Sequence, residues 1–121
     1  MENELSKINE SVEQAMNSRD FVLRTQRQIA KDFRQHGFEF ESDFETDAKT
    51  LSNLLEIVQL KLGEIAESQA SKWLPLMYYL DISEKNYVHF FSNADKNWLE
   101  DFAMIVIKRE AQKVFFREKL R

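Results

Sequence analysis

The stretch FETDAKTLSNLLEIVQLKLGEI, residues 44–65, decides the expected fold. Its apolar residues recur at alternating spacings of four and three, which places them on one face of an α-helix: Phe44, Ala48, Leu51, Leu55, Val58, Leu62 and Ile65. Just upstream, SDFE matches a capping box, in which the side chains of Ser42 and Glu45 each bind the other residue's backbone amide. We therefore expect a long helix over residues 43–69, with Asp43, Glu45 and Asp47 near its positive end.

The alternating acids of GFEFESDFETD, residues 37–47, also invite comparison with a calcium-binding loop. An EF-hand loop needs glycine at its sixth position and glutamate at its twelfth. Counted from Glu39, those positions hold Phe44 and Thr50. The chain has no cysteine and only two histidines, so thiolate zinc sites and three-histidine zinc sites are excluded. We expect no metal site and no cofactor.

The N-terminal region carries a second four-three pattern, which predicts one long helix over residues 3–36. Arg19 and Gln26 interrupt this apolar seam, and Ser18 in NSRD is an alternative N-cap that would divide the helix in two. Because the seam keeps its phase across this site, one helix is favoured. Gly37 can adopt the left-handed conformation that ends a helix, with Phe38 making the apolar contact that accompanies it.

The C-terminal region predicts shorter helices and one long one. Pro75 is compatible with the first turn of a helix that starts after Ser71. Ser83 is a natural N-cap for the next short helix, and a last helix runs to about Leu120. With two glycines and one proline in 121 residues, the chain favours few, long elements. The expected fold is a single all-α domain, residues 1–121: an up-and-down bundle built on a long antiparallel helix hairpin plus a C-terminal helix.

The length of the first helix also bears on assembly and location. A helix over residues 3–36 would span about 50 Å at 1.5 Å per residue, which is long for a domain of this size. We therefore expect a homodimer that buries the projecting seam. No window reaches the apolar length of a membrane span and no signal peptide is visible, so a cytoplasmic protein is expected.

Charge is distributed unevenly along the chain. Residues 37–69 hold eight acids and two bases, a net charge of −6, within a chain whose total is −4. Upstream, four cations are spaced three, four and three apart, which forms one stripe on a helix: Arg24, Arg27, Lys31 and Arg34. This stripe is the candidate partner-binding surface, and it could neutralise phosphates or meet an acidic protein. The alternative is a solvated face in which Arg34 pairs with the acidic start of the second helix.

Other polar and aromatic features have simpler interpretations. His36 lies at a helix end and His89 lies outside any metal-binding pattern, so neither is a candidate ligand. Cations near the C-terminus complement the helix dipole. Trp73, Tyr78 and Tyr79 could line a ligand pocket or an interface, but such aromatics are also ordinary core residues.

The C-terminal residues LDISEK and WLEDFAMIVIKREAQKVFFREKL, within residues 80–120, resemble the C-terminal half of small, uncharacterised helical proteins of Bacteroidetes bacteria. The resemblance implies a helical fold and brings no activity with it.

No motif nominates a catalytic residue, and we expect no enzyme activity. There is no G-x-S-x-G nucleophile elbow and no glycine-rich phosphate loop. The leading hypothesis is a protein–protein interaction or scaffold module that acts through helix faces. The alternative is a nucleic-acid-binding or regulatory protein that uses the stripe from Arg24 to Arg34.

Overall fold

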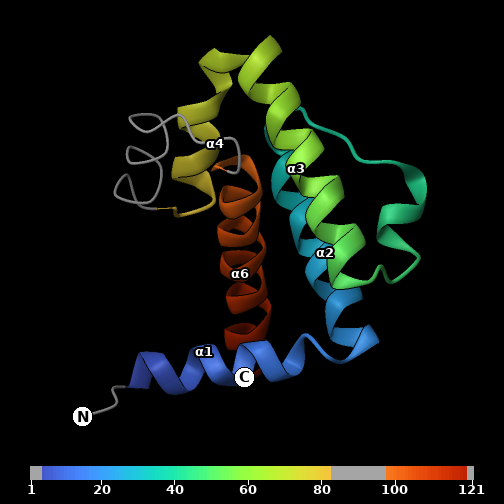
Figure 1. Ribbon diagram of the computed structural model, residues 1–121, viewed down its shortest axis with the longest axis vertical. Coiled ribbons are helices and arrows are strands. Elements are labelled where there is room, and N and C mark those ends of the chain that lie inside the picture. Colours follow the sequence, from blue (N-terminus) through green and yellow to red (C-terminus); the bar gives the residue numbers. More distant parts are fainter. Residues whose placement is uncertain (1–3, 83–97, 120–121) are drawn as a thin grey trace.

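The computed structural model describes residues 4–82 and 98–119, and all the regular secondary structure in these two ranges is helical (Figure 1). Its α-helices are α1 (Glu4–Ala15), α2 (Arg19–Arg34), α3 (Leu51–Ser68), α4 (Trp73–Tyr79) and α6 (Trp98–Lys119). Two 3-10 turns complete it, η1 (Ser42–Glu45) and η2 (Ala70–Lys72). The all-α bundle is confirmed, as are the helix at Pro75 and the long last helix. The helix expected after Ser83, and His89, lie outside the described residues.

The long helix α6 is the antiparallel partner of both α2 and α3. Along α2, Arg24 contacts Glu118 and Asp32 contacts Lys113, so the two helices run in opposite directions. Along α3, the start of α6 lies beside Gly63, whereas Leu51 lines a hollow together with Ile107. It follows that α2 and α3 run in the same direction (Figure 1). The antiparallel pairing expected between residues 3–36 and 43–69 therefore occurs instead between each of these regions and α6.

The N-terminal region forms two helices, which corrects the preference for one helix over residues 3–36. Ser18 has an extended backbone, and its Oγ accepts a hydrogen bond from the Phe21 N–H at 3.3 Å, which caps α2. The break lets α1 lie across the C-terminal half of α6 (Figure 1), where Val12 and Phe21 pack on Ala111 and Val114. An unbroken helix would carry Val12 away from this contact, so burial and the cap outweigh continuity of the helix.

The break also changes the physical argument for a homodimer. That argument rested on a helix of about 50 Å at 1.5 Å per residue, projecting beyond the fold. Because the chain breaks before α2 and α1 crosses α6, a helix of that length is not formed, and self-association stays a prediction.

A crossover from residue 35 to residue 50 replaces the expected hairpin turn. Its 3-10 turn η1 has no side-chain cap, so the capping box predicted at Ser42 and Glu45 is wrong. Instead Thr50 caps α3, and its hydroxyl accepts from the Asn53 N–H at 3.1 Å. Helix α3 therefore starts at Leu51 rather than at residue 43, and the acids expected in its first turns lie in the crossover.

Gln26 explains why the crossover takes this path. Its side chain is fully buried in α2, and its Nε2 donates to the carbonyl oxygens of Phe44 at 2.7 Å and Asp47 at 2.9 Å. Its Oε1 accepts from the Lys49 N–H at 2.7 Å. Buried backbone polar groups need such partners because leaving them unpaired costs about 1–3 kcal/mol each. The residue that interrupted the predicted seam thus holds three backbone groups of the crossover.

The end of α2 confirms the role expected of Gly37. Its φ is +84°, in the left-handed region, and its N–H donates to the Arg34 carbonyl at 3.0 Å. The N–H of Phe38 reaches back to the Phe33 carbonyl, also at 3.0 Å, and the Phe38 ring is buried. These two bonds form a Schellman motif, which releases the chain from α2 into the crossover.

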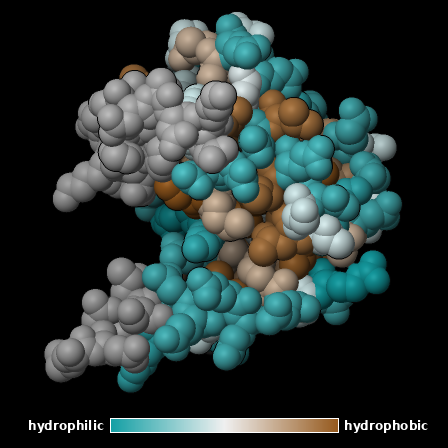
Figure 2. Space-filling model, viewed as in Figure 1, coloured by the Kyte–Doolittle hydropathy of each residue, from teal (hydrophilic) through white to brown (hydrophobic). Residues whose placement is uncertain are grey.

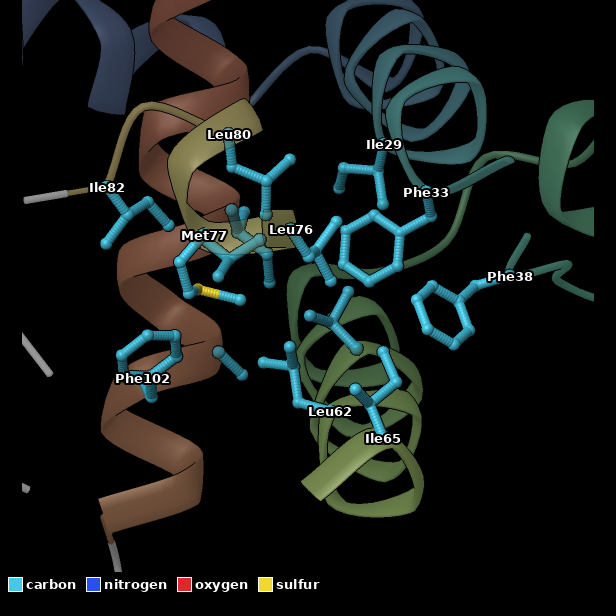
Figure 3. Packing of buried hydrophobic residues seen from close by; sticks show 14 of the residues in the cluster. Ile29, Phe33, Phe38, Leu62, Ile65, Leu76, Met77, Leu80, Ile82 and Phe102 are labelled. Carbon is cyan, nitrogen blue, oxygen red and sulfur yellow. The ribbon is translucent and has the colours of Figure 1, made fainter. Parts of the chain in front are cut away.

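The main core lies where α2, α3, α4 and α6 meet (Figure 3). Side chains from each helix point into it, among them Phe33, Leu62, Leu76, Met77 and Phe102. On α3 the buried side chains are Leu54, Val58, Leu62 and Ile65. Leu51, which the sequence placed on the same face, is 41% exposed. The face predicted for α3 is therefore confirmed at Val58, Leu62 and Ile65, whereas nearer the start of the helix Leu54 is buried and the predicted Leu55 is only partly buried.

Candidate interaction surface

The predicted basic stripe on α2 is largely engaged within the chain. Arg24 forms an ion pair with Glu118 of α6 at 2.5 Å, and Arg34 forms one with Glu45 of η1 at 2.5 Å. Arg27 Nε donates to the Glu45 carbonyl oxygen at 2.9 Å. Lys31 is exposed and has no ion-pair partner within residues 4–82 and 98–119. The pairing expected between Arg34 and the acids after α2 is therefore present, while binding of an external partner by these four residues stays a prediction.

The aromatic residues considered for a pocket lie in three different environments. Trp73 is buried, with its ring centroid 5.2 Å from that of Phe102. Tyr78 is 90% exposed, and Tyr79 lies against His36 with the ring centroids 4.7 Å apart. These three side chains therefore do not converge on one site.

A buried charged cluster between α2 and α6 was not predicted. Asp32 on α2 is 3% exposed and Glu110 on α6 is fully buried. Lys113 Nζ lies 3.0 Å from carboxyl oxygens of both residues. Gln28 Nε2 donates to Asp32 at 3.0 Å, and Gln28 Oε1 accepts from Arg117 at 2.7 Å. The cluster joins the two helices through a polar seam beside the apolar core.

The pKa values of the two carboxyl groups in this cluster are shifted in opposite directions. Burial, together with the proximity of Asp32, raises the pKa of Glu110 to about 9. Although burial opposes it, hydrogen bonds from Glu110, Lys113 and Gln28 lower the pKa of Asp32. Neither Glu110 oxygen has a well-aligned hydrogen-bond donor, so this buried site favours the neutral acid over the carboxylate. At neutral pH the pair therefore holds one proton, on Glu110, and Lys113 balances the charge of Asp32.

A signal for this cluster was present in the sequence. Glu110 lies four residues after Val106 and four before Val114, both buried, so it belongs to the inward face of α6. The spacing of Leu99, Phe102 and Val106 would place Arg109 on that face, but Arg109 instead binds Asp81, with Nη2 2.6 Å from the carboxylate. An acid in phase with the apolar residues of a helix was the feature to follow.

Metal binding by such acids has no support within the described residues. In residues 4–82 and 98–119, no three histidine, aspartate or glutamate side chains are grouped so that they could hold a metal ion. In the same part of the chain, no helix has the length and apolar character needed to cross a membrane.

One exposed apolar surface follows the seam between α3 and α6. Figure 2 shows hydrophobic side chains gathered over the middle of this face, where the two helices lie. At one end, Leu51 and residues of α1 and α6 line a hollow of about 270 Å³, mostly apolar. At the other end, Leu60, which is 67% exposed, lies with Leu99 in a shallow groove. We name this second feature the Leu60 groove; its lining residues are Gln59, Leu60, Gly63, Glu64, Glu67 and Leu99.

Comparisons with protein-family models, with curated proteins and with solved structures give no match. The resemblance of residues 80–120 to small helical proteins of Bacteroidetes therefore stays a prediction.

Proposed function

We propose that the chain is a non-enzymatic protein–protein interaction module, cytoplasmic as the sequence suggests, that binds a partner along the seam of α3 and α6. The supporting observation is the Leu60 groove. Leu60 points outward on α3 with 67% of its surface exposed, next to Leu99 of α6. A single exposed leucine is ordinary, but two adjacent leucines from different helices in one groove form a site for an apolar anchor.

The hollow lined by Leu51 extends this apolar surface along the same two helices. Leu51, Met104 and Ile107 contribute to it, and the ion pair of Lys108 with Glu13, at 3.8 Å, lies at its edge. Methionine adapts its shape to different partners, which suits a binding surface. A partner helix lying along the seam would contact both ends, with apolar anchors in the middle and polar contacts at the rim.

Site-specific photo-crosslinking tests the proposal. A benzoylphenylalanine in place of Leu60 would be compared with the same group in place of Lys31, the exposed member of the basic stripe. We expect a discrete protein adduct from position 60, and equimolar binding of that protein to the purified chain that is lost on Leu60→Glu. Adducts formed only from position 31 would contradict the proposal, and nucleic-acid adducts there would establish the alternative function.

A further inference from the structure

We infer that the Leu60 groove takes a basic amphipathic helix of a partner protein. This inference rests on the function proposed above and adds the chemistry of the partner. It follows from two features of the groove: an apolar floor shaped by Gly63, and a rim of acids of which only Glu64 forms an ion pair among the described residues.

The floor of the groove depends on a missing side chain. A Cβ atom at Gly63 would lie 3.1 Å from Leu99 Cδ2, closer than ordinary van der Waals contact. Glycine in a helix interior costs about 1 kcal/mol relative to alanine, so its place in α3 needs a compensating contact. At Gly63, the absence of a side chain lets Leu99 pack directly on the α3 backbone, and Leu60 lies at the side of the groove that this leaves. An apolar side chain of a partner would fit between the two leucines.

The rim of the groove is acidic. Glu64 and Glu67 line it, and Glu56 is exposed one turn before Leu60. Glu100 and Asp101 are exposed directly after Leu99. The segments 56–67 and 98–101 together hold these five acids and one base, Lys61, a net charge of −4.

The one lysine in these segments does not neutralise the rim. Its Nζ lies 5.4 Å from the centroid of the Phe40 ring and 3.4 Å from Glu64. Among the described residues, Glu56, Glu67, Glu100 and Asp101 form no ion pair. Uncompensated acids around an apolar groove attract a cationic partner and steer its approach.

These features select one class of occupant. An amphipathic helix presents anchors at positions i, i+3 and i+4, which can fill an apolar groove between two helices, with lysine or arginine beside them. Nucleic acid and anionic membranes are repelled by the same rim. On α2 of a second copy, Arg24 and Arg34 already pair with Glu118 and Glu45, so its basic stripe offers the groove fewer free cations than a basic partner helix does.

The test uses designed peptides of about 16 residues, roughly four helical turns. One peptide is an amphipathic helix of leucine and lysine, and its counterpart replaces each lysine with glutamate. Binding of the fluorescently labelled peptides is measured for the wild type, L60S and E64Q/E67Q. The control is E41Q/D47N, which removes the same charge from exposed acids of the crossover.

We expect the basic peptide to bind and its acidic counterpart not to bind. The variants E64Q/E67Q and L60S should each lower the affinity for the basic peptide by about tenfold or more. The control should stay within about twofold, and added salt should weaken binding further. Equal weakening by the control, no effect of L60S, or no binding at all would overturn the inference. A wild-type dimer that dissociates on L60S would also overturn it, because a second copy would then occupy the groove.

Failure of this inference is distinguishable from failure of the proposed function. A crosslinked partner at position 60 whose affinity is unaffected by E64Q/E67Q would keep the interaction module and remove the basic helix. No adduct at position 60 would remove both.

Discussion

Lys113 Nζ of α6 lies 3.0 Å from a carboxyl oxygen of Asp32 on α2 and 3.0 Å from one of Glu110 on its own helix, so that two buried carboxyl groups share one cation. Two buried carboxylates beside one lysine would repel each other, so only one of the two carboxyl groups is ionised at neutral pH. The arrangement links helices that are distant in sequence and makes their contact dependent on protonation.

The first prediction concerns pH. Burial beside Asp32 raises the pKa of Glu110 to about 9, from an ordinary value of 4.5 that also describes the unfolded chain. Its contribution to stability is therefore complete below pH 4.5 and is lost progressively as pH rises toward 9. Between pH 5.5 and pH 8 this one group should lower the free energy of unfolding by up to about 3 kcal/mol.

Glu110→Gln isolates this effect, because glutamine is neutral at every pH and has almost the same shape as protonated glutamate. Urea denaturation at several pH values should show a steeper decline for the wild type than for E110Q. Parallel curves would mean that Glu110 is ionised in the folded protein.

A second prediction concerns the ion pair of Asp32 with Lys113. Asp32→Ala removes the carboxylate whose charge Lys113 balances and leaves Lys113 partly buried without it, at a cost of about 2–4 kcal/mol. Lys113→Ala should cost less in the Asp32→Ala background than alone, by a coupling energy of about 1–3 kcal/mol. Additive effects in this double-mutant cycle would show that the 3.0 Å contact contributes nothing net.

A third prediction concerns Gln26. Gln26→Ala should lower the free energy of unfolding by about 2–4 kcal/mol, because three backbone groups of the crossover lose their partner. Hydrogen exchange should identify the place, with faster exchange at the Lys49 amide that Gln26 Oε1 holds. Arg27→Ala is the matched control, since Arg27 binds only one carbonyl of the crossover and is exposed. Unchanged protection at Lys49 would contradict this account.

A fourth prediction concerns Gly37, whose φ of +84° strains any residue with a Cβ atom. Gly37→Ala should cost about 1 kcal/mol, measured by thermal or urea unfolding. The nearest side-chain atom to an added Cβ, Lys72 Nζ, lies 3.7 Å away, so crowding adds little. A stabilising effect would show that α2 ends differently.

The sequence was sufficient for the class of fold and for the elements that local signals specify. The four-three pattern identified α3, and Gly37 identified the end of α2. The break at Ser18 was visible in the sequence as an alternative, but the continuous phase of the apolar seam favoured one helix. The decisive factor was burial of Val12 and Phe21 against α6. Packing against a helix about 100 residues away leaves no local mark on the sequence.

The order and direction of the helices were harder to predict for the same reason. SDFE matches a capping box, but the buried amide of Gln26 binds the Phe44 carbonyl and holds this segment as a 3-10 turn. The Leu60 groove was also not predicted, because it combines Leu60 with Leu99, which only the packing of α3 on α6 brings together. The basic stripe, by contrast, was visible in one helix, and the structure shows what its members bind within the chain.

The central claim is that the Leu60 groove is the docking surface. Methyl NMR of the leucine side chains during titration with the basic peptide tests it most directly. The account predicts saturable shifts at Leu60 and Leu99, with little change at Leu23 on α2, beside the basic stripe. Shifts confined to Leu23 and its neighbours, or spread evenly over all leucines, would contradict it.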